Sequence, residues 1–312
     1  MRLDVGKLSE TQVFHGSRAR FLYEIIGWIC RDATDLRFMN YGFAFEYAAD
    51  APAVLPEDEA ERYCSQLYHV VAAQADLRGR RVLDIGSGRG GGASYVHRYR
   101  GPAETVGCDF AQRAVDFCNK VHAGCPGLSF RRGDAMDLPF GAAEFDAVLN
   151  VESSHCYPDR AAFFAEVFRV LKPGGQFLYA DFTPPRCDPA TERLRLGADL
   201  AAAGFSDPSP RDITADILRG LDRDDDRRRH WIRVLFPFGT RRFARLWAGT
   251  RGSWIYRDFA EGRRAYLMFR SVKPALPGTT QEDVRHNSST STKVIGAAPA
   301  LTTLCSTPAL RA

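Results

Sequence analysis

Residues 82–91 read Val-Leu-Asp-Ile-Gly-Ser-Gly-Arg-Gly-Gly, and this run decides the fold. The apolar residues around Asp84 are typical of a short buried strand. Glycines at alternate positions from Gly86 to Gly90 let the backbone turn sharply and approach a ligand closely, because they lack Cβ atoms. We expect a helix over about 91–99, whose first N–H groups face the turn. A strand, a glycine-rich turn and a helix N-terminus predict a nucleoside-cofactor site at the carboxyl edge of a parallel sheet.

Short apolar segments and helical patterns alternate along the middle of the chain. Strands are expected at 81–85, 105–108, 128–131, 146–151 and 176–182, and helices at 57–73, 112–122 and 159–171. This alternation predicts a parallel sheet with helices on both faces. Farther along, a sixth strand is expected within 205–213, although Pro208 and Pro210 disfavour it. Two or three aromatic-rich helices and a last strand at 266–269 follow.

The glycine spacing alone does not choose the cofactor. It also fits the dinucleotide fingerprint, with Asp109 at about the right distance downstream to bind a ribose. Asp84, however, precedes the first glycine by two residues, where a carboxylate would repel a pyrophosphate and attract an ammonium group. Two more segments add to this pattern: Arg-Gly-Asp-Ala-Met at 132–136 follows the third strand, and Val-Leu-Lys-Pro-Gly-Gly at 170–175 leads into the fifth.

Taken together, these segments resemble the class I S-adenosylmethionine-dependent methyltransferases over about residues 64–272. The stretches at 62–69, 90–95 and 150–158 are similar, more narrowly, to bacterial natural-product and lipid methyltransferases. These include the phthiotriolone methyltransferases of mycobacterial lipid synthesis and tailoring enzymes of polyketide and terpenoid pathways. The resemblance implies a Rossmann-like fold with a seven-stranded, mostly parallel sheet whose last strand is antiparallel. It also implies S-adenosyl-L-methionine as cofactor and a bulky, apolar acceptor.

Each part of this cofactor needs a different partner. We expect the glycine turn to lie against the amino-acid tail, with Asp84 at the ammonium end. Asp109 is expected to accept from both ribose hydroxyls, and Phe110 to lie beside the adenine. Asp134 and the Ala135 N–H are expected to bind the adenine edge. The full set of predicted cofactor-binding residues is Asp84, Gly86, Ser87, Gly88, Gly90, Asp109, Phe110, Asp134, Ala135 and Asn150.

Methyl transfer requires an aligned acceptor, removal of its proton and exclusion of water. We predict His155 as the general base, because imidazole titrates near neutral pH, and Glu152 as the group that orients it or binds the acceptor hydroxyl. The alternative is that His155 only bonds a backbone carbonyl and that proximity alone supplies catalysis. No metal site is predicted. The predicted acceptor contacts are Tyr41, Tyr68, His69 and Trp231.

The chain is expected to divide into three parts. Residues 1–75 form an N-terminal helical segment over the site, 76–272 form the methyltransferase domain, and 273–312 form a disordered tail, because Ser, Thr, Ala and Pro dominate there. Within the domain, helices at about 214–260 are expected to close over the acceptor as a lid. The apolar stretch at 21–29 motivates the hypothesis of a homo-oligomer.

Composition narrows the class of protein. Of 312 residues, 45% are hydrophobic and 26% charged, with a net charge of +4, as in ordinary soluble proteins. Most basic residues are arginine, which we interpret as a compositional bias rather than a nucleic-acid surface. The eight cysteines form no Cys-x-x-Cys pair, so reduced thiols in a cytoplasmic enzyme are expected, Cys108, Cys118 and Cys156 among them. No signal peptide and no apolar run of about 18 residues is present, so no integral membrane contact is expected.

The sequence therefore predicts a cytoplasmic methyltransferase of specialised metabolism that acts on a hydroxyl of an apolar, polyketide- or lipid-like molecule. C-methylation of a terpenoid or other alkene-bearing acceptor is the first alternative, since the same residues would serve it. A nicotinamide-dependent oxidoreductase is a second, opposed by Asp84 and by the lack of a Tyr-x-x-x-Lys pair. A non-catalytic binding module is a third, opposed by the intact glycine turn and its three acids.

Overall fold

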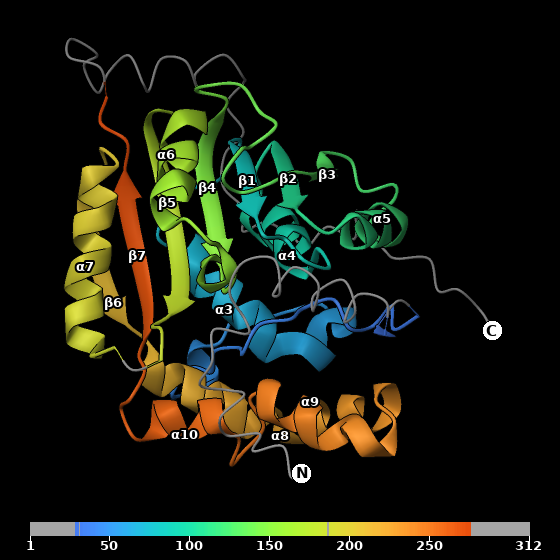
Figure 1. Ribbon diagram of the computed structural model, residues 1–312. Coiled ribbons are helices and arrows are strands. Elements are labelled where there is room, and N and C mark those ends of the chain that lie inside the picture. Colours follow the sequence, from blue (N-terminus) through green and yellow to red (C-terminus); the bar gives the residue numbers. More distant parts are fainter. Residues whose placement is uncertain (1–28, 31, 186, 276–312) are drawn as a thin grey trace.

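The computed structural model describes residues 29–30, 32–185 and 187–275. These residues contain a seven-stranded sheet with the strand order β3-β2-β1-β4-β5-β7-β6. The strands are β1 (Arg81–Ile85), β2 (Glu104–Asp109), β3 (Leu128–Arg132), β4 (Phe145–Val151), β5 (Leu171–Phe182), β6 (Ser206–Asp212) and β7 (Tyr266–Val272). The first five pair in parallel, whereas β7 runs antiparallel to β5 and β6. The predicted seven-stranded, mostly parallel sheet is therefore confirmed (Figure 1).

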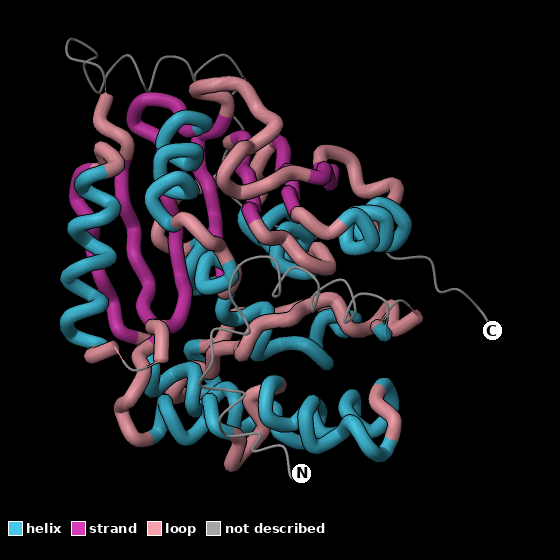
Figure 2. Tube along the Cα trace, viewed as in Figure 1, coloured by secondary structure: helices cyan, strands magenta, loops and turns pink. Residues whose placement is uncertain are grey.

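Helices cover both faces of this sheet. They are η1 (Ala48–Asp50), η2 (Pro56–Glu61), α3 (Arg62–Ala72), α4 (Gly91–Arg100), α5 (Gln112–Val121), η3 (Ser154–Cys156), α6 (Arg160–Val170), α7 (Pro189–Ala202), α8 (Thr214–Leu235), η4 (Phe238–Thr240), α9 (Arg241–Trp247) and α10 (Trp254–Ala260). Residues of α6 and α7 pack in one apolar cluster, and residues of α3, α8 and α10 in another. In Figures 1 and 2, α8, α9 and α10 form a separate layer below the carboxyl ends of the parallel strands.

The side chains of β1 alternate between the two faces of the sheet, and this alternation sets the position of Asp84. Leu83 and Ile85 join the apolar cluster of α6, whereas Val82 joins the cluster of α3. Since side chains of a strand alternate between the two faces, Asp84 lies on the α3 side, where Tyr68 Oη is 3.4 Å from its Oδ2. A largely buried strand thus carries a carboxylate directly into the packing between sheet and helix.

Strand β5 is longer than the sequence predicted. Leu171 already pairs with Phe145, and the next pair in register is Gln176 with Ala147. The Lys-Pro-Gly-Gly residues between them therefore bulge out of the ladder, with Gly174 at a φ of +77°. The expected turn is present, but it is an irregularity within the strand rather than a connection before it.

Strand β6 confirms the sixth strand, in spite of its two prolines. Because β6 is the last strand in the sheet order, it has a neighbour on one side only, and a proline without an N–H group is tolerated there. Its register also shifts between Ser206 and Ser209, and Asp207 within this bulge has a φ of +52°. The edge is short and irregular as a result.

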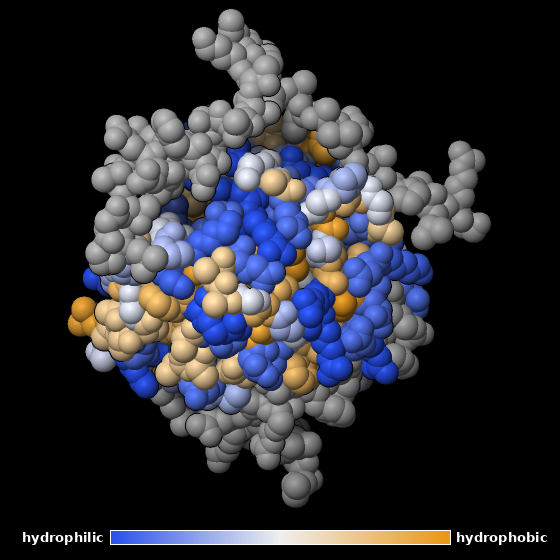
Figure 3. Space-filling view, turned by 90° about the horizontal axis from the view of Figure 1, so that it is seen from above, coloured by the Kyte–Doolittle hydropathy of each residue, from blue (hydrophilic) through white to orange (hydrophobic). Residues whose placement is uncertain are grey.

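The N-terminal part of the described chain is mostly irregular. Residues 32–55 contain only η1 and are otherwise irregular, rather than the expected helices. Most of the apolar stretch at 21–29 and all of 276–312 lie outside the described residues. No helix in the described ranges is long and apolar enough to cross a membrane. Seen from above, from the amino ends of the parallel strands, the surface mixes hydrophilic and hydrophobic residues (Figure 3).

Candidate active site

Two adjoining cavities lie at the carboxyl ends of the parallel strands. The glycine-turn cavity, of about 160 Å³, is lined by the β1–α4 turn and the ends of β2 and β3. The lid cavity, of about 270 Å³, lies between the end of β5 and helix α8. Both lie near β1 and β4, where the strand order reverses and where sheets of this type bind ligands. The residues that line both cavities are Phe38, Met39, Asn40, Glu152 and Cys156.

In the glycine-turn cavity, Asp109 fixes the backbone around it. Its carboxylate accepts from Gly88 N at 2.8 Å and from Ala111 N at 2.9 Å. Phe110 lies at the rim, and the Arg132 guanidinium is 5.7 Å from its ring centre. The last residue of β2 is therefore held by the turn after β1.

The end of β3 completes this cavity. Asp134 and Ala135 both line it, and Asp134 Oδ1 accepts from Met136 N at 3.1 Å. The cavity thus receives one acid from β2 and a second from β3, which the parallel arrangement brings to one edge. The sequence analysis expected both acids, Asp109 and Asp134, at this edge of the sheet.

Two glycines are needed for close approach. Gly86 has a φ of +73°, and a Cβ atom there would lie 2.2 Å from Ser153 Oγ, so the turn packs directly on the loop after β4. A Cβ atom on Gly92 would lie 1.9 Å from the Tyr68 ring. Gly92 therefore lets α3 bring Tyr68 to the cavity wall.

Asp84 is a buried carboxyl with an incomplete set of partners. Burial raises its pKa to about 8, against the hydrogen bond from Tyr68, which favours the charged form. Its Oδ1 has no hydrogen-bond partner among the described residues. Buried polar atoms are nearly always paired in native structures, so this oxygen fits a cationic ligand group.

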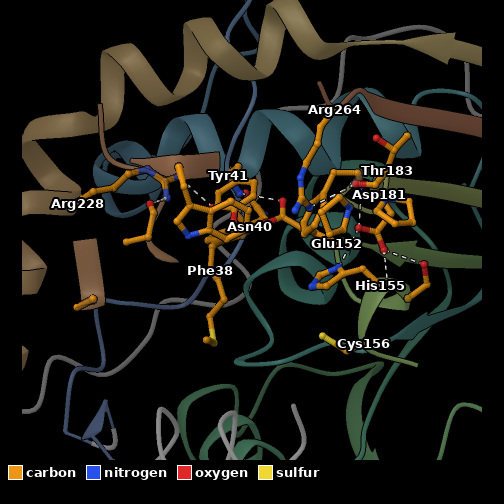
Figure 4. Close-up of a pocket in the computed structure, with 18 of the residues that line it drawn as sticks. Phe38, Asn40, Tyr41, Glu152, His155, Cys156, Asp181, Thr183, Arg228 and Arg264 are labelled. Carbon is orange, nitrogen blue, oxygen red and sulfur yellow. Dashed lines mark hydrogen bonds and ion pairs between the residues drawn. The ribbon is translucent and has the colours of Figure 1, made fainter. Parts of the chain in front are cut away.

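In the lid cavity, His155 and Asp181 form a close pair. His155 Nδ1 is 2.9 Å from Asp181 Oδ1, and the His155 backbone N–H donates to Asp181 Oδ2. Ser154 Oγ donates to the same carboxylate at 2.7 Å. Burial acts to lower the pKa of His155, but its neighbours Cys156 and Asp181 outweigh burial and hold that pKa well above its usual value. Figure 4 shows the pair beside Glu152.

Asp181 is correspondingly held in its charged form. Burial acts to raise its pKa, but the charge of His155 and hydrogen bonds from His155 and Ser154 outweigh burial and lower the pKa. The His155 ring lies at the cavity wall, 4.3 Å from that of Phe182. The pair therefore offers the cavity an oriented imidazole.

Glu152 stands between the two cavities. Its φ of +53° is unusual for a residue with a side chain and directs the carboxyl away from the strand. Oε2 accepts from Tyr41 N at 2.9 Å and from Tyr266 Oη at 3.0 Å. Burial raises the pKa of Glu152 to about 8. One carboxyl thus connects the N-terminal segment, the loop after β4 and strand β7.

The remaining wall of the lid cavity is mainly apolar and aromatic. Apolar residues that line it include Leu36, Phe182, Trp231, Leu235, Phe236 and Trp254. Arg264 is 4% exposed and reaches down to the same region as Tyr41 and Glu152 in Figure 4. Its Nε is 3.2 Å from Asp258 and its Nη1 donates to the Thr183 carbonyl, while Nη2 has no hydrogen bond among the described residues.

The predicted residues divide unevenly between the cavities. Tyr41 and Trp231 line the lid cavity, as expected for acceptor contacts, whereas Tyr68 lines the glycine-turn cavity. His69 lines neither cavity. It is the next residue of α3 and therefore points about 100° away, toward α4, where its Nδ1 is 2.9 Å from Tyr95 Oη.

Two residues predicted to contact the cofactor, Asn150 and Gly90, pack inside the fold instead of lining the cavity. Asn150 is fully buried, and its amide donates to the Ile85 carbonyl at 2.9 Å, so it ties β4 to β1 below the cavity. Gly90 packs against Phe130, where a Cβ atom would be 2.8 Å from the ring. Neither residue lines the cavity, because each is one layer below its surface.

Sequence reasoning missed Asp181 and Arg264. Asp181 was detectable, because it lies next to the last residue of β5 as Asp84 does in β1, and acids near strand ends had already been singled out. Arg264 gave no signal, since it lies among other arginines just before β7. Cys108, Cys118 and Cys156 are free thiols, as expected, whereas Cys125 is disulfide-bonded and departs from the expectation of reduced cysteines. Within the described ranges, no cluster of three His, Cys, Asp or Glu residues could hold a metal ion.

Comparisons with known proteins agree with this geometry. A family model described as a methyltransferase domain matches residues 83–179. A phthiotriol/phenolphthiotriol dimycocerosates methyltransferase of Mycobacterium tuberculosis is 41% identical over 242 residues, 77% of this chain and 86% of that protein. A fatty-acid O-methyltransferase of Mycolicibacterium smegmatis is 42% identical over 244 residues, 77% of this chain and 85% of that protein.

Solved structures show the same fold at lower sequence identity. The cyclase SpnF is 20% identical with a TM-score of 0.63, over 84% of this chain and 97% of its own. Geranyl diphosphate C-methyltransferase from Streptomyces coelicolor, in a complex with S-adenosyl-L-homocysteine, is 18% identical with a TM-score of 0.56, over 80% of this chain and 97% of its own. The chain belongs to the class I S-adenosyl-L-methionine-dependent methyltransferases and uses that cofactor.

Proposed function

We propose that this methyltransferase transfers the methyl group to a hydroxyl of an apolar, lipid- or polyketide-like acceptor held in the lid cavity. The observation that carries the proposal is the His155–Asp181 pair, which faces an aromatic cavity directly beside the glycine turn. The relatives are named for lipid-like substrates, phthiotriol dimycocerosates and fatty acids. Specialised metabolism in the cytoplasm is the setting that we infer for this activity.

The glycine-turn cavity would hold the cofactor, with Gly86, Ser87 and Gly88 along its tail. Asp109, already fixed by two N–H donors, would accept from the ribose hydroxyls, and Phe110 would lie beside the adenine. Asp134 and the Ala135 N–H would bind the adenine edge. The bound cofactor supplies an electrophilic methyl group, so the protein's own task is orientation and proton removal.

Asp84 would serve the ammonium end of this cofactor. Its unpaired Oδ1 and its raised pKa both express the cost of a buried carboxylate without a cation nearby. A positive group beside it would lower that cost and restore the charged carboxylate. Tyr68, whose hydroxyl lies 3.4 Å from Oδ2, would position Asp84 rather than contact the acceptor.

His155 would take the proton from the acceptor hydroxyl at Nε2. Asp181 orients the ring through Nδ1 and stabilises the imidazolium that proton removal creates. Glu152 would close the space between the cavities, because Tyr41 and Tyr266 hold its carboxyl in place. Trp231 and Tyr41 would pack on the apolar body of the acceptor.

A second candidate is methylation of a carboxylic acid. Arg264 places a largely buried guanidinium at the lid cavity with Nη2 unused, and a carboxylate is a natural partner for it. One relative is named a fatty-acid O-methyltransferase. C-methylation has weaker support, since the C-methyltransferase neighbour is 18% identical and shares only the fold.

One assay separates these reactions. The protein is incubated with S-adenosyl-L-methionine carrying a trideuterated methyl group and three long-chain acceptors that each contain a double bond: a secondary alcohol, its stable ether and a carboxylic acid of the same chain length. We expect labelled product from the alcohol alone, and a kcat lower by about 100-fold in His155→Gln. The control His69→Gln should keep full activity. Labelling of the ether would mean C-methylation, and labelling of the acid without dependence on His155 would support the second candidate.

A further inference from the structure

The lid carries a long run of arginines without acids. Between residues 227 and 257 there are nine arginines and no aspartate or glutamate. The arginines at the start of this run, in the second half of α8, are neutralised within the fold, since Arg228 pairs with Asp224 and Arg229 with Asp225. Arg251 pairs with Asp222 in the same way. Most of the positive charge that remains uncompensated therefore lies at the C-terminal end of α8 and in α9, at Arg233, Arg241, Arg242 and Arg245.

That end of the lid also exposes large apolar side chains. Phe238 is 87% exposed and Val234 is 59% exposed, both beside the turn between α8 and α9. We call the exposed residues around this turn the outer lid patch; they are Arg233, Val234, Phe238, Arg242 and Arg245. None of its three arginines forms an ion pair with the described residues. Exposed aromatic and aliphatic groups among unpaired cations are typical of surfaces that bind another molecule.

The outer lid patch and the lid cavity are two sides of the same turn. Leu235 and Phe236, between the exposed Val234 and Phe238, line the cavity, and so does Ala244 of α9. The Arg241 guanidinium stays beside the exposed ring, 5.8 Å from the centre of Phe238. An apolar molecule at the patch would therefore be separated from the lid cavity only by this turn between α8 and α9.

We propose that the outer lid patch docks on an anionic lipid bilayer, from which the apolar acceptor enters the lid cavity. The arginines complement acidic headgroups, and Phe238 and Val234 reach the boundary of the acyl chains. A second copy of the chain fits less well, because two such patches would repel each other. Nucleic acid fits less well too, since phosphate binding gives no use to the exposed apolar side chains.

The test is flotation of the full chain with vesicles, in the absence of acceptor. Vesicles of phosphatidylcholine alone are compared with vesicles that also contain phosphatidylglycerol, at low and high NaCl. We expect binding to the anionic vesicles only, weakened by salt. In the triple variant Arg233→Gln, Phe238→Ser and Arg242→Gln, the partition coefficient of the protein onto anionic vesicles should fall by about tenfold or more. Each arginine near an anionic membrane surface contributes substantially to the free energy of binding.

The matched control on α7 also changes two exposed arginines and one exposed apolar residue. Arg193, Leu194 and Arg195 are exposed there, Leu194 by 73%, and the triple variant Arg193→Gln, Leu194→Ser and Arg195→Gln should bind vesicles normally. Affinity for S-adenosyl-L-homocysteine, measured on both variants, shows that they fold. The proposal would be overturned if the protein did not bind vesicles or if both variants lost vesicle binding equally. It would also be overturned if the protein bound duplex DNA and not the vesicles. Because no turnover is measured, the result is independent of the acceptor's identity.

Discussion

The glycine-turn cavity and the lid cavity share a wall but are assembled differently. The acids of the glycine-turn cavity come from short motifs at the carboxyl ends of β1, β2 and β3. The polar groups of the lid cavity come from distant parts of the chain: Glu152 accepts from Tyr41 and Tyr266, 111 and 114 positions away, and Arg228 donates to the Asn40 carbonyl, 188 positions away. A site built from local motifs is visible in a sequence, whereas one built across the chain becomes visible only in the fold.

Removal of Asp109 should give the largest loss in the glycine-turn cavity. Asp109→Ala takes away the acceptor for two backbone N–H groups and for the proposed ribose contact. We expect the Kd of S-adenosyl-L-homocysteine to rise by about 100-fold or more, because hydrogen bonds to charged groups contribute about 1.5–3 kcal/mol each. Calorimetric titration measures this. Asp116→Ala, an exposed acid on α5, is the control, and unchanged affinity in Asp109→Ala would remove the assignment.

The next largest effect is expected from a substitution that disrupts the close packing of the glycine turn between β1 and α4. In Gly86→Ala the new Cβ atom would meet Ser153 Oγ at 2.2 Å, so we expect the free energy of unfolding to fall by about 2–4 kcal/mol. Gly124→Ala is the matched control, because Gly124 also has a positive φ, +84°, but nothing within 4 Å of its Cβ position. Urea denaturation compares the two. Equal losses would mean that backbone strain alone, without packing, explains the glycine.

In the lid cavity, the variant Asp181→Asn tests the His155–Asp181 pair through the pH dependence of the rate. His155 accepts a proton only in its neutral form, so the rate should rise with pH through its pKa, which Asp181 helps to raise. Without that charge the pKa falls, and the rise should move to lower pH while the maximal kcat drops by about tenfold. The kcat profile against pH measures both. Asp76→Asn, an exposed acid, should leave it unchanged, and an unshifted profile in Asp181→Asn would contradict the role of His155.

The smallest effect is expected at the apolar wall. Trp231→Ala removes part of the surface that would pack on the acceptor, so KM for an apolar acceptor should rise by about fivefold, which corresponds to roughly 1 kcal/mol of lost burial. The affinity for S-adenosyl-L-homocysteine should stay the same. Tyr47→Ala, a 65% exposed aromatic outside both cavities, is the control. A weaker cofactor affinity would show that the two cavities are coupled through the lid.

The sequence predicted β1, β2, β4, β5 and β7 because each carries a run of buried residues, and it predicted the acids at the carboxyl ends of β1, β2 and β3. It left α7 unassigned, since only Leu196 and Leu200 of that helix form its apolar stripe. Within the site, His69 was misplaced because neighbouring positions of a helix face different directions. Arg264 could not be found, because its role depends on contacts with Asp258 and the Thr183 carbonyl that only the fold creates.

The irregular edge strand β6 also bears on how molecules of this protein meet one another. An exposed sheet edge normally offers a row of N–H and C=O groups to which a strand of another chain can pair. Pro208 and Pro210 remove two of these donors, and the bulge at Asp207 bends the ladder. Growth of the sheet from one molecule into the next is therefore hindered at this edge, which protects concentrated solutions of the protein from aggregation.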